Sequence, residues 1–165
     1  EHPDALFMMV GGAVRGDAFF QTLIGKLLRR LDLARNYDRE TRDLINAAGI
    51  GEAIMLVPFT RDTSLRYRAS DVVVAPSRGP ELGRPVIEAA SAGVPVVATG
   101  SRSGGGILVS GVTGLLTSNE PRDLAHAISS LVADPERASA MGRAARYHAE
   151  TYFSPEISTR RMEAM

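Results

Sequence analysis

The chain has 165 residues, of which 44% are hydrophobic and 23% charged, so it has the length and composition of an ordinary folded domain. Its 19 basic and 19 acidic side chains cancel, which argues against a nucleic-acid footprint or a polybasic membrane patch. The absence of cysteine excludes disulfides, thiol nucleophiles and thiolate metal sites. No apolar run approaches the ~20 residues of a membrane span. The absence of cysteine fits a reducing compartment, and a cytoplasmic location is expected.

The first third of the chain predicts two strands separated by helices. Leu6–Val10 is apolar and reads as a buried strand, and Ala53–Val57 reads as a second one. Asp17 is a candidate cap for a long helix, and Thr41–Gly49 predicts a shorter amphipathic helix that stops at its glycine. The long helix is expected to carry one apolar stripe at helical spacing: Phe20, Leu23, Ile24, Leu27, Leu28 and Leu31.

The middle of the chain, from Asp71 to Gly114, predicts a βαβ unit, and a brief helix around Ser64–Ala69 precedes it. Val72–Ala75 is expected to be a strand buried on both faces. A helix follows over Pro85–Ala92, with proline first and glycine just past its end, and Pro95–Ala98 is the next strand. In such a unit a ligand is expected where the first strand ends and the helix begins.

The last third continues the alternation of strands and helices. Leu115–Thr117 predicts a fifth strand, and Pro121 opens a helix in which Leu124, Ile128, Leu131 and Val132 share a face. Asp134–Glu136 combines a cap, a proline and an acidic first turn, which marks the start of a helix with small residues on its inner side. Ser154–Glu156 repeats this pattern. We therefore expect an α/β fold, with a Rossmann-like parallel sheet of about five strands flanked by helices.

The strongest candidate for binding chemistry is Glu88, about one turn into the predicted central helix. Its carboxylate is placed to accept hydrogen bonds from ligand hydroxyls, beside an anion seated on the helix N-terminus. Simple compensation of the helix dipole is the competing interpretation. Gly83, just before that helix, allows backbone N–H groups to approach a phosphate closely, although it can equally be a plain turn glycine.

Further candidate positions follow strand ends. Gly11 and Gly12 come after the first strand, and Gly104–Gly106 is either an anion nest or a flexible turn. Neither stretch matches a Walker loop or a dinucleotide-binding fingerprint, and no catalytic triad or metal-ligand cluster is recognisable. His126 and His148 lie on amphipathic helices and are expected to be partly exposed. Four arginines are predicted near the carboxyl ends of strands, at one rim of the sheet: Arg15, Arg78, Arg84 and Arg102. Binding of an anionic ligand would explain this arrangement, but a general need for soluble surface residues would explain it equally.

Three segments carry a resemblance to a known family: LRYRASDVVVAPS (65–77), ELGRPVIEAASAGVPVVAT (81–99) and GVTGLL (111–116). The tracts ADPER, MGRAAR and FSPE add to it. In order and spacing the chain resembles the C-terminal half-domain of GT-B retaining glycosyltransferases of family 4. The resemblance implies transfer of a sugar from a nucleotide-sugar donor to an acceptor, with no metal or other cofactor.

The resemblance also implies roles for individual residues. Glu88 matches the second glutamate of the family's Glu-x7-Glu pair, which binds the ribose hydroxyls. Leu82 and Gly83 match the pair whose backbone N–H groups meet the diphosphate or the sugar, with Arg84 beside them. The base is expected at the edge formed by Pro58 and Phe59. Gly11 and Gly12 complete the implied donor site.

This chain departs from the family pattern in the loop before the helix. The family's first glutamate falls at Pro80, whereas Glu81, the catalytic candidate, stands one place later. Leu82 replaces a phenylalanine, and Gly106 stands where the family has another glutamate. A degenerate donor site that only binds a nucleotide or a protein is therefore a rival interpretation. So is another GT-B nucleotide-sugar enzyme, such as a phosphorylase or an epimerase. A response-regulator-like domain shares the layer pattern but would need an acidic cluster at the strand ends, which this chain lacks at Val10 and Val57.

Residues 1–165 are expected to form one donor-binding domain that lacks its first strand–helix unit and an N-terminal acceptor-binding domain. The isolated chain is then expected to be inactive. The partners expected are a nucleotide-sugar and an unidentified acceptor, with no nucleic acid. The resemblance leads us to expect a last helix, from Ser154, that pairs with a second copy, and a location at the inner face of the membrane through the missing domain.

Overall fold

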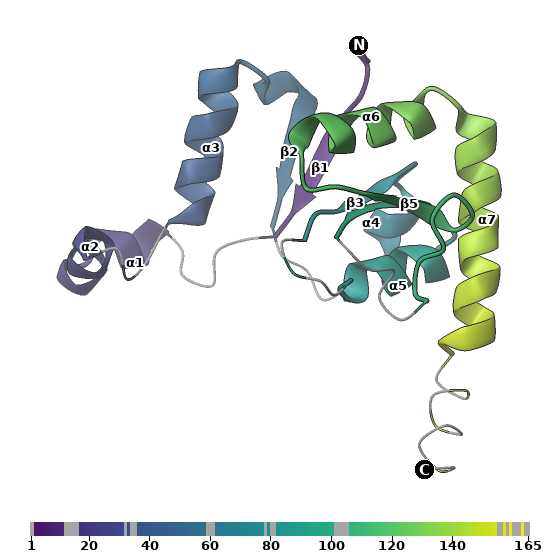
Figure 1. Cartoon of the computed structure of the whole chain (residues 1–165). Helices are drawn as coiled ribbons and strands as arrows, with labels where there is room; N and C mark the ends of the chain where they lie inside the picture. Colours follow the sequence, from purple (N-terminus) through teal and green to yellow (C-terminus); the bar gives the residue numbers. More distant parts are fainter. Residues whose placement is uncertain are drawn as a thin grey trace. The chain divides into compact units, whose positions relative to one another are not determined.

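The computed structural model describes residues 2–11, 17–31, 33, 36–58, 62–77, 79, 82–100 and 106–154, together with 157, 159 and 163. Within these residues the chain has the predicted α/β architecture, in which every paired strand is parallel to its neighbour and helices flank the strands (Figure 1). The chain divides into two compact units, Glu1–Arg61 and Asp62–Met165. The expectation that they form one donor-binding domain stays a prediction.

The first unit holds two strands and the helices between them. Strands β1 and β2 pair in parallel, with Phe7 opposite Ile54 and Val10 opposite Val57. The elements are β1 (Phe7–Val10), α1 (Asp17–Gln21), α2 (Leu23–Arg30), α3 (Tyr37–Ala48), the 3-10 turn η1 (Gly51–Ala53) and β2 (Ile54–Val57). Helix α3 ends as predicted at Gly49, which adopts the left-handed conformation at φ 65°.

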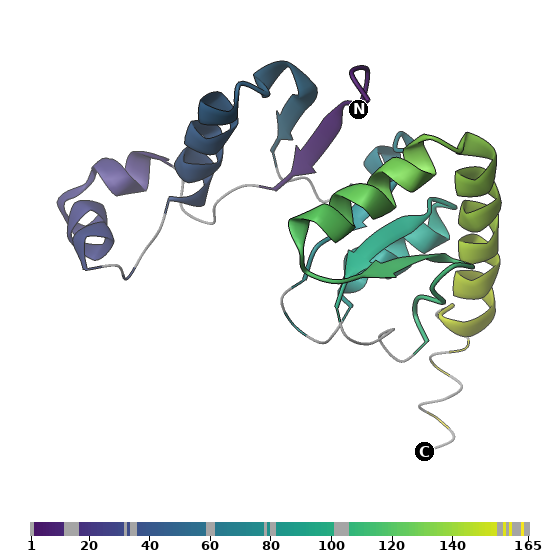
Figure 2. The same cartoon turned by 45° about the horizontal axis from the view of Figure 1, so that its top comes forward.

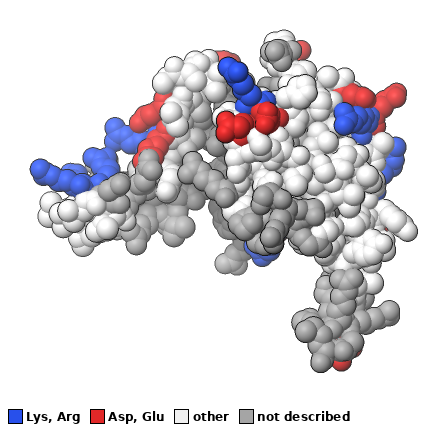
Figure 3. All heavy atoms as spheres, viewed as in Figure 1, with Lys and Arg blue, Asp and Glu red and all other residues white. Residues whose placement is uncertain are grey.

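The long helix predicted after Asp17 is broken at Thr22. The Thr22 hydroxyl donates to the Phe19 carbonyl at 2.6 Å and accepts the Gly25 N–H at 3.0 Å, so it caps a new helix. Gly25 permits the close turn, since a Cβ there would lie 2.1 Å from the Phe19 oxygen. The predicted stripe is buried at Phe20 but exposed at Leu23, Ile24, Leu27 and Leu31. Basic side chains gather at the end of α2 (Figure 3).

The second unit is built on a three-stranded parallel sheet in the order β3-β4-β5. Within the described residues the five predicted strands are present, two paired in the first unit and three in the second. Strand β3 is half-buried, whereas it was predicted to be buried on both faces. The elements are α4 (Ser64–Arg68), β3 (Val73–Ala75), α5 (Arg84–Ser91), β4 (Val96–Thr99), β5 (Gly114–Thr117), α6 (Pro121–Val132) and α7 (Pro135–Tyr152).

Strand β4 is the centre of the core, and all four of its residues are buried. Its side chains alternate between the two faces of the sheet, as the pleat requires. Val96 and Ala98 pack with Val86 and other α5 residues, whereas Val97 packs with residues of α6 and α7. Figures 1 and 2 show α5 and α6 on opposite faces of β3–β5. The sheet is therefore covered on both sides, which holds the ends of its strands in place.

Helix α5 ends in a Schellman turn that brings the chain directly into β4. The Gly93 N–H bonds to the Ala90 carbonyl at 2.9 Å and the Val94 N–H bonds to the Ala89 carbonyl at 3.0 Å. Gly93 has φ 77°, which confirms its predicted place just past the helix. Proline is the second helical residue rather than the predicted first, because Arg84 already begins the helix.

Helix α7 has small residues on its inner side, as predicted, and through them it packs against α5. Ala145 and Ala149 are buried with Ala90, and Gly142 meets the Gly93 backbone. The Asp134 carboxylate accepts the Arg137 N–H at 3.0 Å, which confirms the predicted cap. On α6, the predicted apolar face is buried at Leu131, but Val132, which was assigned to the same face, is exposed. Among the helices described, none combines the length and apolar content that crossing a membrane requires.

Candidate functional site

The carboxyl ends of β3 and β4 are tied together by one buried hydroxyl. Thr99 is only 2% exposed. Its Oγ1 accepts the Ser77 N–H at 2.7 Å and donates to the Ser77 carbonyl at 2.9 Å. The residue from which the predicted ligand loop departs is thereby fixed to the central strand. The loop returns at Leu82, which is buried in the core with Val86.

Replacing Thr99 by valine is expected to destabilise the second unit by about 1–3 kcal/mol, because both Ser77 backbone groups lose a buried partner. Thr99→Ser keeps the hydroxyl and is the matched control, with an expected loss below about 1 kcal/mol. Urea denaturation followed by circular dichroism measures both variants. Equal stability of the valine and serine variants would contradict a role for this hydrogen-bonded pair.

The N-terminus of α5 offers backbone N–H groups to a ligand. Gly83 is the N-cap and contributes no side-chain cap. Within the described part of the chain, the N–H groups of Gly83 and Arg84 have no protein acceptor, and Pro85 has no N–H. The first turn of a helix carries partial positive charge, so this end of α5 is suited to an anion.

Glu88, one turn further along α5, is half-buried and hydrogen-bonded. The Tyr67 hydroxyl of α4 donates to Glu88 Oε2 at 2.9 Å. Within the described residues the other carboxylate oxygen has no protein partner. Compensation of the α5 dipole alone does not account for this hydrogen bond from a second helix.

The environment of Tyr67 favours its neutral hydroxyl. Burial is the largest cause, followed by the hydrogen bond to Glu88 and the negative charge of that carboxylate, and together they raise the pKa of Tyr67 to about 12. The positive charge of Arg84 acts in the opposite direction on the same pKa. Tyr67 therefore remains a hydrogen-bond donor throughout the neutral range.

Tyr67 and Glu88 both line a hollow of about 610 Å³ on the surface of the second unit. Its lining is mixed: hydroxyl and charged groups lie beside the apolar side chains of Ile87 and Ala92. Thr63, Ser64 and Tyr67 contribute from α4 and its cap, Ile87, Glu88 and Ser91 from α5, and Arg146 from α7. The hollow is large enough for a nucleoside-sized ligand. A second hollow, of about 630 Å³, is lined by α7 alone and holds none of the predicted site residues.

The remaining predicted site residues fall into two groups. Gly11 and Pro58 belong to the first unit, where each follows the end of a strand, and the Gly11 N–H donates to the Val57 carbonyl at 3.1 Å. The others lie outside the described residues: Gly12, Phe59 and Glu81 from the proposed donor site, and Arg15, Arg78 and Arg102 from the predicted rim. No group of acidic or histidine side chains able to hold a metal occurs in the described part of the chain.

Two residues near the predicted site had no functional signal in the sequence. Tyr67 is one, because its partner lies 21 positions away. His148 of α7 is the other: its Nε2 lies 2.6 Å from the Gly106 carbonyl, so it holds the residue that ends the glycine-rich stretch. His148 also contacts the rings of Tyr152 and Phe153. It is half-buried and His126 is exposed, in agreement with their expected partial exposure.

The parallel sheet with helices on both faces is the Rossmann-like architecture of GT-B C-terminal domains. HepE from Anabaena, in a crystal structure with UDP, superimposes with a TM-score of 0.79 at 24% identity, over 98% of this chain and 41% of that one. Sucrose-phosphate synthase from Thermosynechococcus elongatus superimposes with a TM-score of 0.74 at 26% identity, over 95% of this chain and 36% of that one.

Sequence comparison identifies the family. The model of the family described as "Glycosyl transferases group 1" matches residues 1–148, and the chain belongs to that family. It is 36% identical over 120 residues to a D-inositol 3-phosphate glycosyltransferase of Gordonia bronchialis, covering 70% of this chain and 26% of that protein. A protein of the same name from Arthrobacter sp. is 36% identical over 131 residues, covering 76% and 30%. The chain thus spans less than a third of the length of these two relatives.

Proposed function

We propose that this chain binds the nucleotide-sugar donor of a retaining glycosyltransferase of family 4. One observation carries the proposal: a half-buried carboxylate, Glu88, faces a hollow from the same helix whose N-terminus offers backbone N–H groups. Glu88 accepts the ribose hydroxyls, while Gly83 and Arg84 bind the diphosphate through their backbones. Membership of the family supports both assignments.

The spacing along α5 suits a nucleotide diphosphate. Arg84 and Glu88 are four positions apart, which corresponds to about 6 Å along a helix axis. The ribose hydroxyls and the diphosphate of one nucleotide are separated by the ribose itself, so a single ligand can contact both positions. The diphosphate is then placed outside the hollow, because Gly83 and Arg84 are not among the residues that line it. Arg84 and Glu88 also lie on the same face of the helix, since residues four apart are neighbours.

The chemistry proposed for the protein is sugar transfer without a metal or other cofactor. Rate acceleration comes from holding the donor in place and stabilising the leaving diphosphate. Glu81 is assigned to the donor sugar, and Gly11, Gly12, Pro58 and Phe59 to the nucleotide. The acceptor binds to a separate N-terminal domain, so we expect no turnover from the 165-residue chain alone. A hexosyl donor and a cytoplasmic location, at the inner face of the membrane through that domain, belong to the same proposal.

Calorimetric titration of the full-length protein with UDP, GDP and ADP tests the proposal directly. UDP is the first choice, because HepE, which shares the fold, was crystallised with UDP and with UDP-glucose. We expect saturable binding of one nucleotide and transfer from the matching nucleotide-sugar. Failure of all three to bind would overturn the donor assignment. Binding without transfer would favour the non-catalytic module, and dependence on free phosphate would favour a phosphorylase.

A further inference from the structure

We propose that Tyr67 is a positioning residue that holds the Glu88 carboxylate in the orientation required by a ribose cis-diol. This inference rests on the proposed donor-binding role of Glu88. It adds a residue from a different helix to the site and assigns to that residue the discrimination between ribose and deoxyribose.

The hydrogen bond between Tyr67 and Glu88 joins helices α4 and α5 at the hollow. The Tyr67 hydroxyl lies 2.9 Å from Glu88 Oε2, and both side chains line the hollow. The tyrosine ring packs against the core cluster that contains Val86 and Leu108. The hydroxyl is therefore held from behind by the core and does not depend on a flexible surface side chain.

The hydrogen bond that Glu88 Oε2 accepts from Tyr67 determines the direction in which the other carboxylate oxygen, Oε1, points. A glutamate side chain ends in a torsion with a broad energy minimum, so a carboxylate without a partner rotates easily. The bond from Tyr67 fixes that rotation and leaves Oε1, together with a second lone pair on Oε2, to accept hydroxyl protons. Two neighbouring hydroxyls of a ribose match these two acceptors, whereas a 2′-deoxyribose supplies only one donor.

The positioning role requires that Tyr67 donates and never accepts from the carboxylate. Its raised pKa keeps the proton on the hydroxyl, because burial and the adjacent negative charge both disfavour the phenolate. Arg84, the positive group that acts on Tyr67, is one helical turn before Glu88. It is exposed and makes no ion pair with Glu88 among the described residues, so it does not replace the hydroxyl.

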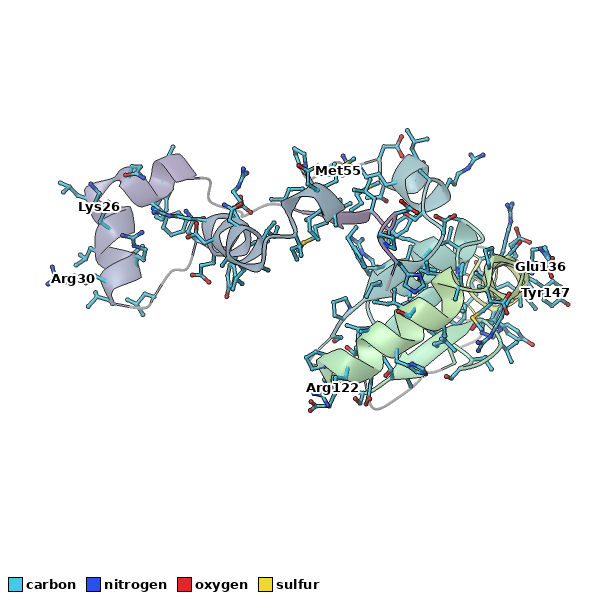
Figure 4. All side chains as sticks on the ribbon, turned by 90° about the horizontal axis from the view of Figure 1, so that it is seen from above. Lys26, Arg30, Met55, Arg122, Glu136 and Tyr147 are labelled. Carbon is cyan, nitrogen blue, oxygen red and sulfur yellow. The ribbon has the colours of Figure 1, made fainter. Side chains whose placement is uncertain are left out.

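The test compares UDP with 2′-deoxy-UDP in the full-length protein, and GDP and ADP with their 2′-deoxy forms, by calorimetry. The wild-type protein is expected to prefer the ribonucleotide. Tyr67→Phe is expected to lower ribonucleotide affinity about tenfold, the size of one hydrogen bond, and to leave deoxynucleotide affinity nearly unchanged. Tyr147→Phe removes a hydroxyl from an exposed tyrosine on the outer side of α7 and is the matched control (Figure 4). Thermal denaturation of each variant checks folding.

The outcomes separate the two proposals. If Tyr67→Phe and Glu88→Gln both abolish the preference for ribose, the positioning role is supported. If Glu88→Gln abolishes it but Tyr67→Phe keeps it, or weakens both nucleotides equally, the positioning role is overturned while the donor site stands. If the wild-type protein binds a nucleotide without preference, Glu88 does not contact the diol, and both assignments fail.

Discussion

Replacing Glu88 by alanine is expected to lower donor affinity and kcat/KM at least about a hundredfold in the full-length protein. Each hydrogen bond from a ribose hydroxyl to a carboxylate contributes about 1.5–3 kcal/mol, and two such bonds are lost together. The substitution removes nothing from the core, since Glu88 faces the hollow and Tyr67. Calorimetric titration with the nucleotide and steady-state kinetics with the nucleotide-sugar measure the two effects.

Glu136→Ala is the control for this result, because Glu136 is an exposed glutamate near the start of α7 (Figure 4). It is expected to change affinity less than about twofold. Glu88→Gln keeps the size of the side chain and an oxygen for the Tyr67 hydroxyl, so it separates loss of charge from loss of packing. If transfer survives Glu88→Ala undiminished, the hollow beside α5 is not the donor site.

Replacing Gly142 by alanine is expected to destabilise the second unit by about 2–4 kcal/mol, although alanine is the better helix former by about 1 kcal/mol. A Cβ at this position would lie 2.1 Å from the Gly93 carbonyl oxygen and 3.2 Å from Pro95 Cδ. The obstacle is backbone, so α7 has to move away from the turn that ends α5. That movement would open the contact of Ala145 and Ala149 with Ala90.

Gly51→Ala is the matched control, since a Cβ there meets no atom of the described residues within 4 Å and Gly51 has no positive φ. It is expected to leave the midpoint of urea denaturation nearly unchanged, whereas Gly142→Ala lowers it. If the two variants denature at the same urea concentration, α7 does not depend on close contact at this glycine.

Helix caps and helix ends could be predicted from the sequence, because the contacts that form them span only a few residues. Asp134 caps α7 because its own carboxylate reaches the Arg137 N–H three residues later. Gly49 and Gly93 end their helices in the left-handed conformation that glycine adopts without strain. The misjudged helix start and the missed helix break had local causes as well. Arg84 precedes Pro85 in α5, and Thr22 competes for the backbone of the helix predicted from Asp17.

The sequence by itself determined the α/β class, the parallel strands and the candidate helix that carries Glu88, because these follow from periodicity and from caps that span one turn. Only the tertiary structure decided what surrounds that helix. The bond between Tyr67 and Glu88, and the one between Ser77 and Thr99, join residues 21 and 22 positions apart. The order β3-β4-β5 in the second unit also depends on which strand edges meet in space. The apolar runs predicted where the strands lie but not how far each is buried: Phe7, Met9 and Val10 of the strand predicted to be buried are exposed, whereas all four residues of β4 are buried.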